Sequence, residues 1–138
     1  MKGSSKYDLV MAQKSVATKL GLKAGRTLLV RSAPGPIADL LGALPDGAAW
    51  VDSGSGPFPM ILVFARNRAA MIKELPAAKS KLEPGGILWI AYAKGTSDKA
   101  TDINRDSIRE HVASIGLNTV AQIAIDDDWS ALRLKVVA

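Results

Sequence analysis

Cysteine is absent from this chain of 138 residues, and histidine occurs once, as His111. The lack of cysteine excludes disulfides, thiolate nucleophiles and cysteine-ligated metal centres, and it favours a cytoplasmic location. A Ser-His-Asp triad would have to use His111, which lies beside Val112 on a predicted helix. We therefore expect His111 to be a partly exposed helix residue rather than a catalytic base.

Long apolar runs are also lacking near the start of the chain. The first twenty residues contain only the short apolar run 9–12, far less than a signal-peptide core or the ~20 residues of a membrane span. We therefore expect no membrane segment and no membrane partner. With 48% hydrophobic residues, the chain is long enough to bury one core, and we expect a single domain over residues 1–138.

Positive charge is concentrated in one part of the sequence, although the formal net charge is only +5. The cations of the first quarter are Lys2, Lys6, Lys14, Lys19, Lys23, Arg26 and Arg31. A basic face attracts nucleic acid through its long-range field, but no aromatic RNA-binding motif is interleaved with these charges. A solvated basic surface is the simpler interpretation, and nucleic acid is retained as an alternative partner.

Two apolar strands and the helix between them organise the chain. The runs PMILVFA (59–65) and ILWIAYA (87–93) are continuously apolar and too short for buried helices. Between them, apolar residues recur at helical spacing: Met71, Leu75, Ala78 and Leu82. Pro76 should kink this helix or divide it into two. Strands that are apolar on both faces are typical of a parallel sheet covered by helices on both sides.

The remaining elements follow from the same periodicities. We expect helices over about 7–20, after Pro36, and from Asn104 to Gly116, and strands at 27–31, 48–52, 118–125 and 131–137. Right-handed crossovers and short connections then predict one sheet of about six strands in the order 2-1-3-4-6-5. The predicted fold class is a three-layer, Rossmann-like α/β domain with a mostly parallel sheet and an antiparallel C-terminal strand.

The carboxyl ends of these strands are the predicted ligand site. In open α/β sheets, ligands bind outside the carboxyl ends where the strand order reverses, which is between the first and third strands here. The residues at the strand ends are Arg31, Ser32, Gly35, Asp52, Arg66, Asn67 and Lys94. If the three cations converge, they form a crevice for a phosphate or carboxylate, aided by the helix N-terminus after Pro36. The alternative is that the three cations point into solvent from separate loops.

Two other polar clusters carry weaker signals. Helix capping explains Asn104 and dipole compensation explains Asp106, but neither explains Arg105, which could lean toward the same crevice. Asp126, Asp127 and Asp128 could ligate a hard cation through oxygen. Because three consecutive carboxylates on a hairpin cannot all face one ion, we expect a solvated turn and no metal site.

Several motifs resemble a known family. They are KLGLKAG (19–25), LPDG (44–47), GGILWIAYAKG (85–95), TDINRDSIR (101–109) and IDDDWSALRLKV (125–136). Together they resemble the small bacterial domain-of-unknown-function family 3052, and the overall pattern is similar to a reduced class I methyltransferase fold. The resemblance implies a Rossmann-like, methyltransferase-like domain and little else, because the activity of that family is not established.

The segment after the first strand departs from the methyltransferase pattern. The resemblance implies an acid and several glycines there, whereas this chain has Arg31 followed by Ser-Ala-Pro-Gly-Pro. Asp52 stands where a ribose-binding acid belongs. We therefore expect a non-catalytic domain without a cofactor, which binds a small anionic ligand or a protein partner. The alternatives are a small S-adenosylmethionine-dependent methyltransferase with a degenerate cofactor loop, and a structural domain that forms homo-oligomers through its C-terminal strand.

Overall fold

The structure is a computed structural model that describes residues 15–97 and 99–137. The predicted helical residues 7–14 and the cations Lys2, Lys6 and Lys14 lie outside these ranges.

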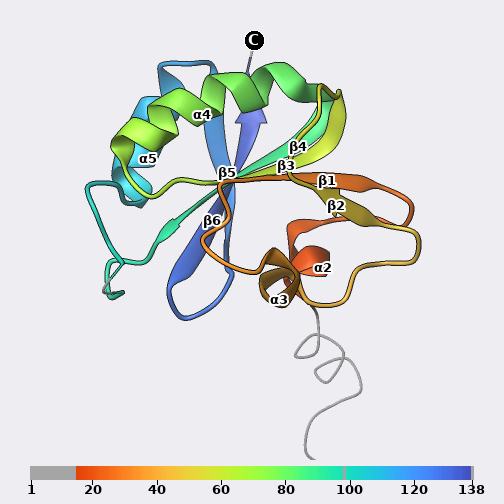
Figure 1. Cartoon of the computed structure of the whole chain (residues 1–138). Helices are drawn as coiled ribbons and strands as arrows, with labels where there is room; N and C mark the ends of the chain where they lie inside the picture. Colours follow the sequence, from red (N-terminus) through yellow and green to blue (C-terminus); the bar gives the residue numbers. More distant parts are fainter. Residues whose placement is uncertain (1–14, 98, 138) are drawn as a thin grey trace, which may run out of the picture.

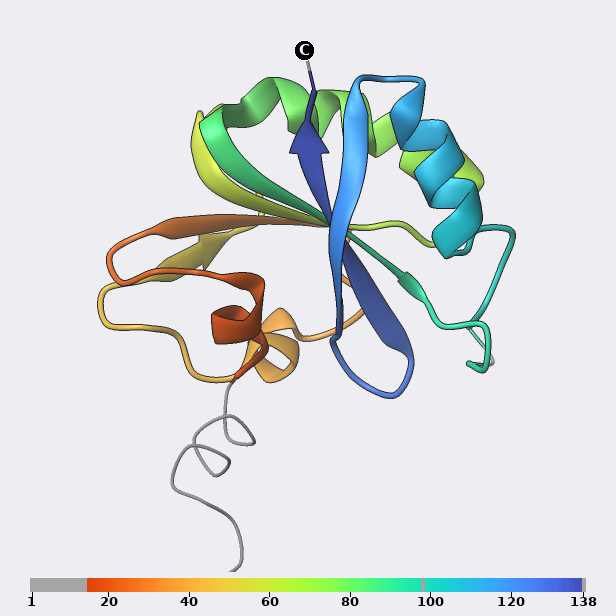
Figure 2. The same cartoon turned by 180° about the vertical axis from the view of Figure 1, so that it is seen from behind.

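A six-stranded sheet runs through the middle of the molecule (Figures 1 and 2). Its strands are β1 (Thr27–Arg31), β2 (Ala49–Val51), β3 (Phe58–Phe64), β4 (Leu82–Ala93), β5 (Leu117–Ala124) and β6 (Trp129–Val136). They lie in the order β2-β1-β3-β4-β6-β5. The first four strands are parallel to one another, and β6 pairs antiparallel with both β4 and β5. The predicted strand order and fold class are thereby confirmed.

Helices cover both faces of the sheet, as its apolar strands require. Figure 1 shows α4 (Arg68–Lys81) and α5 (Arg105–Ala113) on one face, and α2 (Val16–Leu20) and α3 (Ile37–Leu41) on the other. Successive side chains of a strand point to opposite faces of the sheet: Ile61 packs under α4 and α5, and Leu62 packs toward α2 and α3. None of the helices in the described ranges has the length and apolar character of a membrane span.

Helix ends follow the local signals in the sequence. Asn104 is the N-cap of α5 and forms a capping box with Ser107. Asn67 is the N-cap of α4, since its side chain accepts a hydrogen bond from the Ala70 amide. Gly21 ends α2 with φ of +96°, a left-handed conformation that favours glycine.

Helix α4 passes through Pro76 as one helix, so the expected division into two helices is wrong, and the alternative of a kink stays a prediction. A proline in a helix leaves the carbonyl four residues earlier, here that of Ile72, without its donor. Pro76 is exposed and Ile72 is 45% exposed, so water can reach this side of the helix.

Strand β4 starts at Leu82, five residues before the predicted start at Ile87. The pairing of β3 with β4 explains the difference. Phe58 pairs with Leu82 and Met60 pairs with Ile87, so β4 has more residues than β3 between these two pairs. Residues 83–86 therefore form an irregular bulge. Gly86 is required there, since a Cβ on it would lie 2.9 Å from the carbonyl oxygen of Glu83.

One buried hydrogen bond joins the N-terminal described helix to the sheet. Nε1 of Trp89 donates to the carbonyl oxygen of Leu20 over 3.0 Å, and both residues are buried. This bond links the end of α2 to β4, so it should contribute to the stability of the whole α2 and α3 face.

We expect Trp89→Phe to lower the free energy of unfolding by about 1–3 kcal/mol, because a buried carbonyl loses its donor. Urea denaturation measures the change. Trp129→Phe is the matched control: Trp129 is similarly buried and packs edge-to-face on Phe64, and its indole makes no hydrogen bond to the described residues. An equal or larger loss in Trp129→Phe would contradict the role given to the Trp89 hydrogen bond.

Candidate functional site

Two cavities open at the carboxyl ends of the parallel strands. The first, the β1–β2 cavity, has a volume of about 410 Å³. Its walls include Val30, Ser32, Gly35, Ile37, Trp50 and Asp52. The second, the Trp129 cavity, has a volume of about 360 Å³. It is lined by Pro34, Arg66, Lys99, Thr101 and Trp129. The loop 32–36 contributes to both cavities, so the two sites are neighbours.

Ser32, Gly35 and Asp52, three of the residues predicted from the sequence, meet in the β1–β2 cavity. The Asp52 carboxylate is exposed and has no hydrogen-bond or ion-pair partner within the described residues. A Cβ on Gly35 would meet no atom within 4 Å, so this glycine borders open space. Trp50 belongs to the same cavity and was not predicted, because a lone tryptophan in a short strand gives no spacing signal.

Ser32 adopts a strained backbone conformation at the edge of this cavity. Its φ of +61° makes it the one residue other than glycine with positive φ in the described chain. The left-handed region costs an L-residue roughly 1–2 kcal/mol. Such strain is concentrated at ligand sites and tight turns, so Ser32 marks the end of β1 as a position where the chain is held in an unfavourable geometry.

Arg31 is not among the described residues that line either cavity. Its Nη1 donates to the backbone oxygen of Asp52 over 2.8 Å, and its Nε lies 3.6 Å from a carboxylate oxygen of Glu74. The guanidinium group therefore joins the ends of β1 and β2 to α4. The sequence offered no signal for Glu74 as a partner, because it lies on a helix predicted only for its apolar stripe.

Arg66 and Asn67 follow β3 but have different surroundings. Arg66 lines the Trp129 cavity, and its backbone oxygen accepts a hydrogen bond from the hydroxyl of Thr101. The Asn67 side chain is used as the α4 cap, 2.8 Å from the Ala70 amide nitrogen. The adjacent Arg68 amide donates to Asp102, so the β4–α5 loop is bound to the start of α4.

Lys94 and Arg105 line neither cavity. Lys94 is half-buried, and its backbone amide donates to the carbonyl oxygen of Asp128. Nη1 of Arg105 donates to Gln122 over 3.3 Å, and the Gln122 amide in turn donates to the Tyr92 hydroxyl over 3.3 Å. Burial raises the pKa of Tyr92, and the nearby Arg105 charge opposes this effect. Arg31, Arg66 and Lys94 thus occupy separate surroundings rather than one crevice, and ligand binding by any of them stays a prediction.

The acidic residues of the β5–β6 hairpin hold the turn and the neighbouring loop. A carboxylate oxygen of Asp126 accepts hydrogen bonds from the Asp128 and Trp129 amides, both over 2.8 Å. Asp128 accepts from the Ser97 hydroxyl over 2.8 Å and from Nζ of Lys99 over 3.1 Å. These hydrogen bonds, the one from Ser97 first, lower the pKa of Asp128 from its ordinary value. Within the described ranges, no group of three acidic or histidine side chains is placed to hold a metal ion.

Comparisons with known proteins bear on this geometry. No protein-family model and no curated protein match the sequence. A SAM-dependent methyltransferase from Aquifex aeolicus matches with a TM-score of 0.61 and 12% identity, over 96% of this chain and 90% of that one. A ribosomal protein L11 methylase from Lactobacillus delbrueckii subsp. bulgaricus matches with a TM-score of 0.57 and 12% identity, over 100% and 81% of the two chains.

A third solved structure is a SAM-dependent methyltransferase from Thiobacillus denitrificans in complex with S-adenosyl-L-homocysteine. It matches with a TM-score of 0.54 and 11% identity, over 96% of this chain and 92% of that one. The chain has a methyltransferase-like Rossmann fold. Identities this low show the fold alone, and membership of family 3052 stays a prediction because no family model matches.

We expect Ser97→Ala to raise the pKa of Asp128 toward its ordinary value, because the largest cause of the lowering is removed. An NMR titration of the side-chain carboxyl carbons measures this. A lowered folded-state pKa stabilises the protein at pH above the unfolded value of 3.8, and this contribution is lost as the pH falls through the folded value. The wild type should therefore lose more stability on acidification than Ser97→Ala.

Ser80→Ala is the control for this titration, since the Ser80 hydroxyl donates to Ala77 within α4 and does not contact the hairpin. An Asp128 pKa that is the same in wild type and Ser97→Ala would contradict the assignment.

Proposed function

We propose that this chain is a methyltransferase-like domain that binds an adenosyl compound, S-adenosylmethionine or S-adenosylhomocysteine, in the β1–β2 cavity. The observation that carries the proposal is the grouping of Asp52, Trp50 and Gly35 around a volume of about 410 Å³. Cavities for small molecules and cofactors measure roughly 300–1,000 Å³ and combine apolar walls with a few polar groups. Both the size and the composition of the β1–β2 cavity are therefore suitable for an adenosyl compound.

Each of these residues offers a part of nucleoside recognition. The Asp52 carboxylate can accept hydrogen bonds from the two ribose hydroxyls, because an ionised carboxylate is an acceptor with two oxygens. Trp50, Val30 and Ile37 provide apolar wall for an adenine ring. Gly35 leaves room beside the loop where a side chain would intrude.

The charge of the cavity favours an adenosyl compound over a nucleotide. Among the residues that the structure describes, one acid, Asp52, and no lysine or arginine line the β1–β2 cavity. Helix α3, which starts at its edge, has five residues and begins after Pro36, which has no amide proton to donate. A phosphate would meet the Asp52 carboxylate there with no lysine or arginine among the described lining residues to offset the repulsion, whereas S-adenosylmethionine carries a positively charged sulfonium group. The anionic ligand expected from the sequence therefore suits the β1–β2 cavity poorly.

The structural neighbours add support for a cofactor, since one of them was solved with S-adenosyl-L-homocysteine. These neighbours give no support to the expectation from the sequence that this chain binds no cofactor. A cytoplasmic location and a single-domain organisation belong to the same proposal, and they rest on the lack of cysteine and on the length of the chain.

We expect S-adenosylhomocysteine to bind saturably in isothermal titration calorimetry, and Asp52→Asn to weaken binding by about tenfold or more, because a hydrogen bond to a charged group contributes roughly 1.5–3 kcal/mol. Asp46→Asn is the matched control, since Asp46 is exposed at the other end of β2. Adenosine monophosphate should bind more weakly than S-adenosylhomocysteine. Absence of any saturable heat, or equal losses in the two variants, would refute the proposal.

Methyl transfer is the second candidate function, and the Trp129 cavity favours it. This cavity shares the loop 32–36 with the β1–β2 cavity, so an acceptor bound there would lie next to the adenosyl compound. Arg66 and Lys99 make it the more basic of the two cavities, which suits an acceptor that carries a carboxylate or phosphate.

The two roles are distinguished by incubating the protein and cell extract with S-adenosylmethionine labelled in its methyl group. Label transferred to a product by the wild type, and strongly reduced with Asp52→Asn, would support methyl transfer. Binding of S-adenosylhomocysteine without any transfer would support the non-catalytic role.

A further inference from the structure

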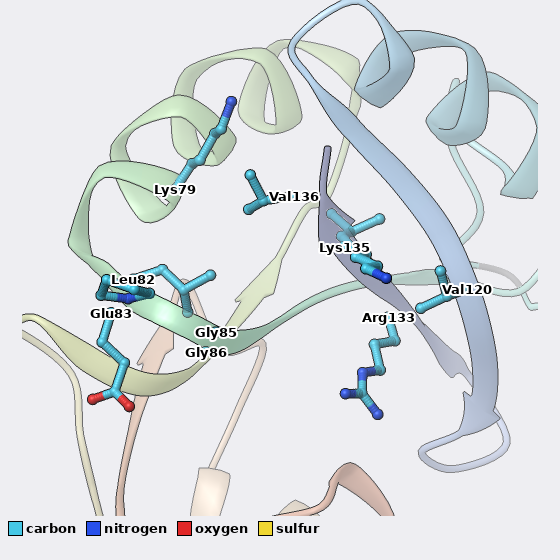
Figure 3. Close-up of a pocket in the computed structure, with 11 residues that line it drawn as sticks. Lys79, Leu82, Glu83, Gly85, Gly86, Val120, Arg133, Lys135 and Val136 are labelled. Carbon is cyan, nitrogen blue, oxygen red and sulfur yellow. The ribbon is translucent and has the colours of Figure 1, made fainter. Parts of the chain in front are cut away.

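A fork in the sheet lies at the end opposite the two cavities. Strands β4 and β6 pair from Leu88 with Leu134 to Ala93 with Trp129. Beyond Leu88, residues 82–87 of β4 have no partner in β6, and Lys135 and Val136 pair only with β5. A cavity of about 500 Å³ occupies this gap (Figure 3). The backbone of Lys135 and Val136 has no strand partner on the side that faces it.

The walls of the fork are apolar and exposed. Val120 is 52% exposed and Val136 is 47% exposed, and both line the cavity together with Leu82. Gly85 also lines it, and a Cβ on Gly85 would meet no atom within 4 Å. Valines this exposed gain burial when another chain covers them.

The rim of the fork is basic. Lys79, Arg133 and Lys135 line the cavity, and Glu83 is the one acid among the lining residues that the structure describes. None of these cations forms an ion pair with any residue that the structure describes, although Nζ of Lys79 donates to the carbonyl oxygen of Ile115 over 2.7 Å. The fork therefore carries a net positive charge with no acidic partner in the described molecule.

The cations do not converge on one point. In Figure 3, Lys79 extends from α4 above the sheet, whereas Arg133 extends from β6 toward the opposite side. A phosphate or another small anion needs several donors aimed at one place. Charges spread along an apolar gap suit an extended chain with several carboxylates instead.

We propose that the fork is a docking site for an extended, acidic peptide segment of another protein, in which apolar residues alternate with Asp or Glu. Alternate side chains of an extended peptide point to opposite sides. Its apolar side chains would cover Val120 and Val136, its carboxylates would meet Arg133 and Lys135, and its backbone would pair with the free side of β6 at Lys135 and Val136. This site is separate from the adenosyl site, since the fork lies beside the start of β4, whereas the β1–β2 cavity lies at the carboxyl ends of β1 and β2.

The test uses the whole chain and a display library of random linear peptides of twelve residues. We expect enrichment of sequences in which apolar and acidic residues alternate. The tightest-binding peptide is then synthesised with a fluorophore, and its affinity is measured by fluorescence anisotropy. The double variant Arg133→Glu with Lys135→Glu should lose about tenfold or more in affinity, because complementary charges become repulsive. Val120→Asp tests the apolar wall, and its exposure means that the fold should tolerate it.

The matched control is Lys73→Glu with Arg109→Glu, the same charge reversal at two exposed helix positions away from the fork. It should leave the anisotropy titration within about twofold of wild type. All variants should bind S-adenosylhomocysteine as the wild type does. A failure of the peptide-docking proposal is therefore distinguishable from a failure of the adenosyl-binding proposal.

Three results would overturn the proposal. The first is that the library enriches no peptide, or only peptides without acidic residues. The second is that the peptide binds Arg133→Glu with Lys135→Glu as tightly as it binds the control variant. The third is a concentration-dependent dimer in light scattering that Arg133→Glu with Lys135→Glu abolishes. The last result would assign the fork to a second copy of this chain.

Discussion

Burial of the central strands on both faces is the constraint on which the rest of this structure depends. Residues 28–30, 61–64 and 88–91 are almost completely inaccessible to solvent. Strands of this kind are stable only between two layers of helices, and parallel strands need a crossover segment between each pair. The same requirement places the carboxyl ends of β1, β2 and β3 at one edge. Polar side chains next to these central strands can reach solvent only where the strands end or separate, and both candidate sites lie at such places.

The two ends of the sheet therefore carry opposite chemistry. At the carboxyl ends of β1 and β2, an apolar wall and the Asp52 carboxylate, which has no partner among the described residues, suit a nucleoside without phosphate groups. At the fork, Arg133 and Lys135 beside exposed valines suit a segment with acidic side chains. Since the strands between these ends are buried and closely packed, each site can be changed by substitution with little effect on the other.

Loop contacts give the carboxyl end its shape. The β4–α5 loop is bonded to the start of α4 through Asp102 and Arg68, and to the hairpin turn through Ser97 and Asp128. These bonds hold Thr101 and Trp129 beside Arg66, where they form the second cavity. The acidic residues of the β5–β6 hairpin resemble a metal site in composition. In the structure, one of them, Asp128, holds the β4–α5 loop through its hydrogen bond with Ser97.

The sequence by itself determined the strands, the strand order, the Asn104 cap and the positions of Ser32, Gly35 and Asp52 at one edge, because these depend on local periodicity and on general rules of chain connection. Only the tertiary structure decided that Arg31 bonds to Asp52 and Glu74, that Asn67 is used as a cap, and that the cations at the strand ends occupy separate surroundings. It also decided the fork, since the bulge at 83–86 breaks the register that periodicity assumes. The direction and partners of a charged side chain depend on distant segments, which no local pattern contains.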